Sequence, residues 1–204
     1  MKASSIRLLV AASLLALASN VQGVPPGPER EFEKAKEAYL KKDYPKAEKH
    51  LRSLLKNAPD FMFGHLYLGH SLFYQDKYRE AIPEYERAAE LGAKGGEMNQ
   101  DDERLLTDQL GMAYGLSGRL RDAKTLFEAG IQKDPEYALY YYNLACTNGE
   151  LGQLDEALSN LKLGFARRKH MLPGETYPNP RTDDSFKRYL NDPKFDAAMK
   201  EMGF

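Results

Sequence analysis

One short pattern recurs four times along this chain of 204 residues and constrains its fold more than any other feature. Each copy has a turn residue, then an aromatic residue or leucine, then two mostly polar residues and an alanine. The spacings between copies are 34, 42 and 34 residues, measured between Ala47, Ala81, Ala123 and Ala157. A small residue lies twelve positions before each alanine, at Ala35, Gly69, Gly111 and Ala145. Such self-similarity is typical of chains built from stacked supersecondary units.

The hydrophobic pattern between these markers is helical. From Glu29 to about Arg168, apolar residues recur at i, i+3, i+4 and i+7, and no stretch alternates with period two for long enough to form a strand. Asp43 and Asp76 come just before predicted helices and are good N-cap residues. The sequence therefore predicts an all-α fold of paired helices.

Several residues at fixed positions in each period then identify a family. The Leu-Gly pairs at 68–69 and 110–111, the aromatic Tyr114 and the closing Pro59 and Pro135 all match, and the chain resembles the tetratricopeptide repeat family over about residues 28–170. The resemblance implies a right-handed α-solenoid of about four helix pairs, which stack because one pair cannot bury its apolar face alone. Within a solenoid of residues 29–170, the expected units are about 28–61, 62–95, 104–137 and 138–170.

Two segments depart from the repeat. The longer spacing adds about eight residues (96–103) between the second and third units, and the glycines of the stretch 92–103 predict a mobile loop there, either a tolerated insertion or a contact loop. Residues 171–204 are not a fifth repeat, because 171–181 contains three prolines and is followed by two predicted short helices, 183–190 and 193–202. We expect this C-terminal helical cap to cover the last open face of the solenoid.

The N-terminus has the order of a secretory signal peptide over residues 1–23. Lys2 and Arg7 precede an almost unbroken apolar run at 8–18, and Val21-Gln22-Gly23 offers a cleavage site, with 16–18 as an alternative. The run is too short to span a bilayer, although an uncleaved anchor is a second interpretation. The proline-rich residues 24–28 are expected to be an extended linker. We therefore expect an exported protein, either periplasmic or secreted, with no transmembrane segment in its mature chain.

Composition and motifs argue against several kinds of chemistry. A formal net charge of −1 gives no general attraction to nucleic acid, and a single cysteine cannot form an intrachain disulfide or a multi-cysteine metal site. The four histidines form no His-Glu-x-x-His motif, no glycine-rich nucleotide loop is present, and Cys146 has no obvious neighbouring base. We predict that the chain is not an enzyme and has no cofactor and no metal.

The remaining candidate is the concave groove, which the first helices of the units line in this family. Projection of the register places a largely aromatic set there: Phe63, Leu66, Tyr67, His70, Phe73, Tyr74, Gln109, Met112, Tyr142 and Asn143. Aromatic side chains supply a large contact area at low entropic cost, which suits recognition, although the same residues can simply pack between helices. Of the residues by which chaperone-binding members clamp a terminal carboxylate, only Asn143 is retained, so co-chaperone function is not expected.

These observations favour one function and leave two alternatives. We expect a non-catalytic adaptor or scaffold that binds a protein or peptide in its concave groove, without nucleic acid. The alternative is a self-associating structural component of a cell-envelope complex, hence a homo-oligomer, and an enzyme with an unrecognised site is the least favoured. The sequence does not name the partner.

Overall fold

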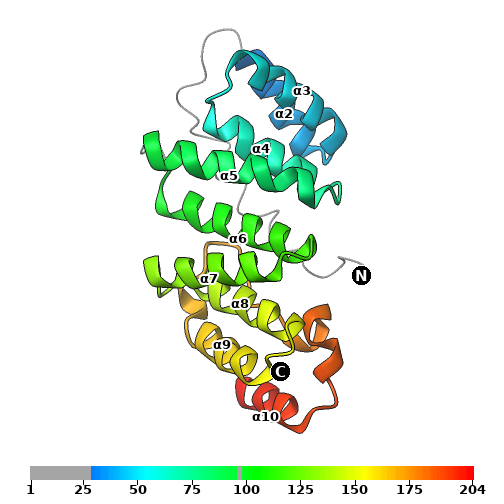
Figure 1. Cartoon of the computed structure of the whole chain (residues 1–204), viewed down its shortest axis with the longest axis vertical. Coiled ribbons are helices and arrows are strands. Elements are labelled where there is room, and N and C mark those ends of the chain that lie inside the picture. Colours follow the sequence, from blue (N-terminus) through cyan, green and yellow to red (C-terminus); the bar gives the residue numbers. More distant parts are fainter. Residues whose placement is uncertain (1–28, 96–97) are drawn as a thin grey trace. The chain divides into compact units, whose positions relative to one another are not determined.

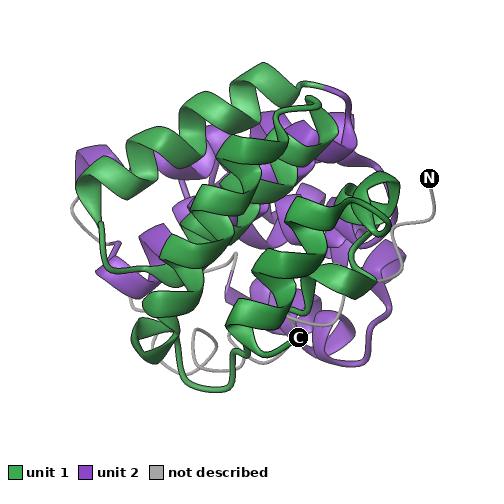
Figure 2. Cartoon of the chain, turned by 90° about the horizontal axis from the view of Figure 1, so that it is seen from below, with its two compact units in different colours: residues 1–16, 119–204 green, residues 17–118 purple. Residues whose placement is uncertain are grey.

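The computed structural model describes residues 29–95 and 98–204, so the expected signal peptide and linker lie outside the described residues (Figure 1). The chain divides into two compact units, whose described parts are residues 29–95 and 98–118 of unit 2 and residues 119–204 of unit 1 (Figure 2). Every regular element in the described residues is helical, which confirms the all-α prediction. Within these ranges, no helix is both long enough and apolar enough to cross a bilayer.

The described residues of unit 2 form five helices. They are α2 (Glu29–Leu40), α3 (Tyr44–Asn57), α4 (Met62–Phe73), α5 (Tyr78–Gly95) and α6 (Gln100–Leu116). The helix pairs α2–α3 and α4–α5 pack together as predicted, and α3 packs on α4 and α5 on α6. Because the chain reverses between consecutive helices, α4 and α6 run in the same direction (Figure 1).

Unit 1 begins with the second helix of the expected third repeat. Its elements are α7 (Leu120–Lys133), α8 (Ala138–Glu150), α9 (Leu154–Ala166), the short 3-10 helices η2 (Arg168–His170), η3 (Pro180–Thr182) and η4 (Asp184–Tyr189), and α10 (Pro193–Met202). Helices α8 and α9 form the fourth predicted pair. The boundary between the units thus falls inside the expected repeat 104–137, which contributes α6 to unit 2 and α7 to unit 1.

The turn between the two helices of each repeat has the same backbone conformation in all four copies. The residue five positions before the repeat alanine has a positive φ in every case: Lys42 (59°), Asp76 (62°), Gly118 (87°) and Gly152 (80°). This left-handed conformation lets the chain reverse within a few residues. Asp43 caps α3 as predicted, because its side chain accepts a hydrogen bond from the backbone N–H of Lys46. Asp76 instead occupies the left-handed turn position, and its carboxylate accepts from the Tyr78 hydroxyl.

The small residues lie at close helix contacts, as the repeat pattern predicts. All four repeat alanines are fully buried. Gly69 of α4 faces the ring of Tyr85 on α5, and a Cβ atom added at Gly69 would lie 2.7 Å from that ring. A larger side chain at this position would therefore push the paired helices apart.

A histidine–glutamate pair joins the two helices of each of the first two repeats. His50 Nδ1 lies 2.8 Å from a Glu31 carboxylate oxygen, and His65 Nδ1 lies 2.7 Å from one of Glu84. The two pairs occupy equivalent positions 34 residues apart, with histidine and glutamate exchanged between the helices. His65 Nε2 also lies 2.8 Å from the carbonyl oxygen of Pro59, so both ring nitrogens face acceptors and the imidazolium form is favoured.

The segment expected as a mobile loop at 92–103 is largely helical. Helix α5 continues through Pro83 to Gly95, and α6 already begins at Gln100. Asn99 and Asp102 form a reciprocal capping box at the start of α6, in which each side chain accepts a hydrogen bond from the backbone N–H of the other residue. Of the additional residues 96–103, positions 100–103 therefore belong to the first turn of α6.

The C-terminal segment packs on α8 and α9 of unit 1. Helix α10 starts at a capping Asp192 and packs on α9, while η4 packs on α8. Phe186 and Phe195 are fully buried against one another, with ring centroids 5.7 Å apart. Gly149 of α8 leaves room for this contact, since a Cβ there would lie 3.0 Å from the carbonyl oxygen of Ser185.

Candidate functional site

Helix α4 contains five of the ten predicted groove residues, and a sixth, Tyr74, directly follows its last residue. Its sequence is apolar around nearly the whole circumference, and every residue from Met62 to Phe73 except His65 is buried. A helix that is apolar on all sides belongs in a core. Helices α3, α5 and α6 pack on α4, and aromatic side chains of α2 cover the remaining side.

Two aromatic residues of α2 enclose Tyr67 of α4. The Phe32 and Tyr39 rings meet the Tyr67 ring edge-on, with centroid distances of 5.5 and 5.4 Å. Two α4 turns later, Tyr74 stacks on Tyr44 at the start of α3, with centroids 4.7 Å apart and an interplanar angle of 14°. These offset and edge-on arrangements are the favoured ones for aromatic pairs. Packing between the first two repeats therefore accounts for much of the predicted aromatic face.

The eight predicted groove residues in unit 2 differ in accessibility. Six of them are buried (Phe63, Leu66, Tyr67, His70, Phe73 and Gln109), whereas Tyr74 and Met112 are half-buried. Tyr74 and Met112 are therefore the most accessible members of this set, although the Tyr74 hydroxyl is itself buried. A binding role for the whole set stays a prediction.

Several polar atoms among these buried residues have no hydrogen-bond partner in the described structure. They include the hydroxyl oxygens of Tyr67 and Ser71, Nε2 of His70, and both amide atoms of Gln109. Buried polar groups of this kind are rare in folded proteins and call for an explanation. Ser71 was not predicted as a site residue, and no sequence pattern marks it.

His70 and Tyr67 are electrically neutral in this environment. His70 Nδ1 lies 2.9 Å from the Tyr85 hydroxyl, and complete burial lowers the pKa of His70 to about 3. Burial, with smaller contributions from the charges of Asp102 and Glu33, raises the pKa of Tyr67 to about 12. Both side chains thus present uncharged groups near neutral pH.

The last two predicted groove residues, Tyr142 and Asn143, lie on α8 in unit 1. Tyr142 is buried, its hydroxyl donates to Asp183 at 2.9 Å, and its ring meets Tyr177 at a centroid distance of 5.3 Å. Both contacts come from the C-terminal segment, which covers Tyr142. Asn143 is half-buried. The structure therefore divides the predicted set between the two units, eight residues in unit 2 and two in unit 1.

Cys146 has the environment of a packed thiol and not of a nucleophile. Its Sγ lies 3.7 Å from the Asp183 carboxylate, and burial followed by that negative charge raises the pKa of Cys146 well above its usual range. A raised pKa suppresses the reactive thiolate. Among the described residues, no group of three or more histidine, cysteine, aspartate or glutamate side chains could hold a metal ion.

The basic residues after α9 serve to end that helix. The Arg167 guanidinium donates to the carbonyl oxygens of Pro135 at 2.8 Å and Leu163 at 3.1 Å, and it lies over the ring of Tyr141. Arg168 donates to the carbonyl oxygen of Phe165 and covers that ring. The carbonyl groups of Leu163 and Phe165 belong to the last turn of α9, where positive charge is favourable, whereas that of Pro135 lies in the turn before α8.

Comparison with known proteins supports the repeat assignment. Two tetratricopeptide repeat family models match residues 32–90 and 126–159. No curated protein matches the chain by sequence. Among solved structures, a crystal structure of MamA protein is 18% identical with a TM-score of 0.64, covering 86% of this chain and 91% of that one.

Two further solved structures show the same fold. MamA residues 41 to the end from Desulfovibrio magneticus RS-1 is 19% identical with a TM-score of 0.61, covering 70% of this chain and 76% of that one. YrrB, described as a TPR protein with an unusual peptide-binding site, is 15% identical with a TM-score of 0.60, covering 94% and 92%. The repeat period, the helix pairs and these matches together show that the chain belongs to the tetratricopeptide repeat family.

Proposed function

We propose that this chain is a non-catalytic scaffold of an exported compartment that binds a protein or peptide partner through the α4–α6 face of unit 2. A role in protein interaction follows in general terms from the repeat fold. The observation that supports this face is the partial exposure of Tyr74 and Met112, the two members of the predicted groove set in unit 2 that are not buried. The peptide-binding site named for YrrB agrees with a peptide as ligand.

Catalysis is not part of this proposal. The single thiol of the chain, Cys146, is held in its unreactive protonated form, and the basic cluster after α9 donates to carbonyl groups at the end of that helix. The charged side chains of the repeats pair mainly with one another along helix surfaces, as Glu37 does with Lys41. The proposed binding role depends instead on the partly exposed side chains of Tyr74 and Met112 in unit 2.

Site-specific photo-crosslinking tests the proposed face. A photoreactive amino acid at position 74 or 112 is expected to crosslink to a protein partner in the native host, whereas the same amino acid at the exposed position 79 on α5 is not. The partner is then purified, and its affinity is expected to fall at least tenfold with Tyr74→Ala, because that ring borders the face. Equal crosslinking at all three positions, or unchanged affinity, would contradict the proposal.

Export is the second part of the proposal and rests on the signal-like residues 1–23. N-terminal sequencing of the protein isolated from its host is expected to begin at Val24, after Val21-Gln22-Gly23. A start at Met1 in a cytoplasmic fraction would contradict export without bearing on the binding face.

A further inference from the structure

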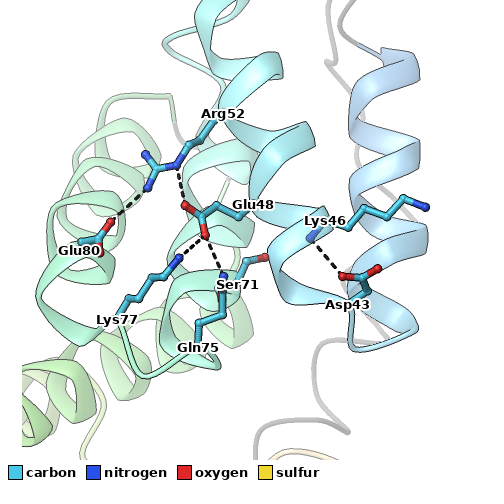
Figure 3. Close-up of polar contacts among 8 residues, drawn as sticks. All are labelled: Asp43, Lys46, Glu48, Arg52, Ser71, Gln75, Lys77 and Glu80. Atoms are coloured by element: carbon cyan, nitrogen blue, oxygen red, sulfur yellow. Dashed lines mark hydrogen bonds and ion pairs between the residues drawn. The ribbon is translucent and has the colours of Figure 1, made fainter.

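Polar groups link helix α4 to its neighbours at both of its ends. Just after its C-terminal end, Gln75 and Lys77 each donate a hydrogen bond of 2.9 Å to Glu48 of α3 (Figure 3). Near its N-terminal end, the ring of His65 contacts both α5 and the turn 58–61, which connects the first repeat to the second. Positions 65 and 75 are about 15 Å apart along the helix axis, so the two links are separate.

The link at Glu48 keeps its charge throughout the neutral pH range. Burial would raise the pKa of Glu48, but hydrogen bonds from Lys77, Arg52 and Gln75 outweigh burial and lower this pKa to about 2. The donors that face it are a lysine, an arginine and an amide, none of which changes its charge near neutral pH. This end of α4 is therefore held in the same way at pH 6 and at pH 8.5.

The link at His65 requires a ring that is protonated on both nitrogens. Nδ1 lies 2.7 Å from a carboxylate oxygen of Glu84, and Nε2 lies 2.8 Å from the carbonyl oxygen of Pro59. A neutral imidazole has one N–H donor for these two acceptors. It keeps the proton that faces the carboxylate, because charge-assisted hydrogen bonds are the stronger ones. Loss of one proton therefore places a lone pair of Nε2 against the carbonyl oxygen of Pro59.

The connecting turn has a second contact with α5, which does not involve a histidine. Arg87 of α5 forms an ion pair with Asp60 of the turn and another, at 2.7 Å, with Glu90. Asp60 is 74% exposed, and exposed ion pairs contribute little to stability. The His65 side chain is only 14% exposed, so its hydrogen bond to the turn is the stronger of the two contacts.

The charges around His65 favour its protonated form. Burial lowers the pKa of His65, but the hydrogen bonds to Glu84 and to the Pro59 carbonyl outweigh burial and raise this pKa, against a smaller opposing contribution from the charge of Arg87. The carboxylate of Asp60, in the turn, also favours a positive ring.

The other helices that contact α4 add no positive charge among the contacts described near this position. Helix α3 places Leu55 against Gly64, which directly precedes the histidine. Glu33 of α2 and Asp102 of α6 act on Tyr67, two positions further along α4. Because both are carboxylates, they favour the protonated ring as well.

We propose that the turn 58–61 is a proton-controlled joint between the first two repeats, closed while the His65 ring carries both protons and released when it loses one. The Glu48 link at the other end of α4 stays in place, so the release is confined to one edge of the junction between the repeats. The joint acts in the free protein and does not depend on the proposed binding role. Because the pKa of His65 is raised on folding, closure is complete below about pH 6.5 and is lost as the pH rises through the raised value.

Amide hydrogen exchange, followed by NMR at pH 6 and at pH 8.5, tests the joint in the wild-type protein. The amides of Phe61, Gly64 and His65 donate hydrogen bonds in the turn and at the start of α4, whereas those of Gln75 and Lys77 report on the other end. After correction for the intrinsic exchange rate at each pH, the protection factors of the first three are expected to fall about tenfold at pH 8.5. Those of Gln75 and Lys77 are expected to change by less than about twofold.

Two histidine variants and a titration complete the test. His50 forms the equivalent pair with Glu31 within the first repeat, so His50→Asn is expected to keep the full pH response of the turn. His65→Asn is expected to show low protection of the turn at both pH values. In the wild type, which needs no variant to fold, the loss of protection should follow the titration of the His65 ring, monitored by its nitrogen chemical shifts.

Three results would overturn the inference. The first is equal protection of the turn at pH 6 and pH 8.5. The second is an equal loss at both ends of α4, which would mean that the whole unit loosens. The third is a midpoint that follows the ring of His50 instead of the ring of His65. None of these results bears on partner binding through Tyr74 and Met112.

Discussion

Glu48 is the residue whose charge most directly ties the first repeat to the second. From α3 it accepts hydrogen bonds from Arg52 Nε at 2.8 Å, Gln75 Nε2 at 2.9 Å and Lys77 Nζ at 2.9 Å (Figure 3). Gln75 and Lys77 belong to the turn between α4 and α5. Glu48→Gln keeps the size of the side chain but removes the charge, so we predict that it destabilises unit 2.

The size of the effect follows from the environment of the carboxylate. Burial would raise the pKa of Glu48, but the hydrogen bonds from Lys77, Arg52 and Gln75 outweigh it and lower the pKa from 4.5 to about 2. A tenfold change in the acid dissociation constant corresponds to about 1.4 kcal/mol, so the upper bound is roughly 3 kcal/mol. The side chain is 14% exposed, and ordering of the partner side chains offsets part of the gain, so we expect a loss of about 1–2 kcal/mol at pH 7.

The lowered pKa also fixes how the effect depends on pH. Because the pKa is lower in the folded state, the stabilisation is complete above about pH 4.5 and is lost as the pH falls toward 2. Urea unfolding followed by circular dichroism is expected to show wild type more stable than Glu48→Gln at pH 7. The difference should shrink by about half at pH 3. An equal difference at both pH values, or none at pH 7, would refute the electrostatic reasoning.

Glu80→Gln is the matched control. Glu80 also accepts from Arg52, but at 3.4 Å, and its side chain is 58% exposed. Exposed pairs contribute little, so we expect a change below about 0.5 kcal/mol. A loss as large as that of Glu48→Gln would mean that burial of the network does not determine its strength.

Three further predictions concern other parts of the chain. Gly164→Ala should destabilise the fold, because the added Cβ would lie 2.9 Å from a backbone carbonyl oxygen. Gly115 has open space around it, so Gly115→Ala should stabilise the fold by about 0.5–1 kcal/mol. Thermal unfolding measures both variants, and equal melting temperatures would contradict this account of the packing. Burial lowers the pKa of His65, but hydrogen bonds to its glutamate and backbone partners outweigh this and raise it. The stability advantage of wild type over His65→Asn should therefore be larger at pH 6 than at pH 8. Urea unfolding at the two pH values measures this difference, and a larger advantage at pH 8 would contradict the prediction. Asp183→Ala should loosen the C-terminal cap and increase the rate at which a disulfide reagent modifies Cys146 severalfold, and an unchanged rate would show that the cap does not shield the thiol.

The close contacts within repeats could be predicted from the sequence because they depend on residue size alone. Ala35 and Ala47 are fully buried where the period requires small side chains, and Gly69 leaves space for the Tyr85 ring. The size of a side chain is a local property, and its recurrence at the same position in four repeats makes the close contacts recognisable in the sequence. The same holds for the start of α10 at Asp192 and Pro193.

The helical ends of the segment 92–103 could have been predicted but were not. Its glycines suggested a loop, yet Asn99 and Asp102 stand in the spacing of a capping box, which indicates a helix start. Asp76 failed as a predicted cap for a different reason. A short polar residue suits both an N-cap and a left-handed turn, and the neighbouring repeats, with Lys42 and Gly118 in the left-handed conformation, show that the turn position takes precedence here.

The face of α4 lay beyond sequence reasoning because it depends on which rings meet across repeats. Projection of the register assigned Tyr67 to a groove, but α2 supplies the rings of Phe32 and Tyr39 that enclose it. A helix that is apolar all round has no side that its own sequence marks as exposed. The division of the predicted groove residues between unit 2 and unit 1 could not be predicted either, because all four repeats carry the same pattern.

Glu48 and Gln109 are two polar residues of unit 2 that differ in their number of hydrogen-bond partners. Glu48 is half-buried and has three partners, so its charge stabilises the fold and its removal should cost stability. Gln109 is fully buried with no partner, so the fold gains nothing from its amide, and an apolar side chain of similar size should be tolerated. A melting temperature of Gln109→Leu equal to or above that of wild type is therefore expected in thermal unfolding, and a clear fall would show that the amide has a structural role.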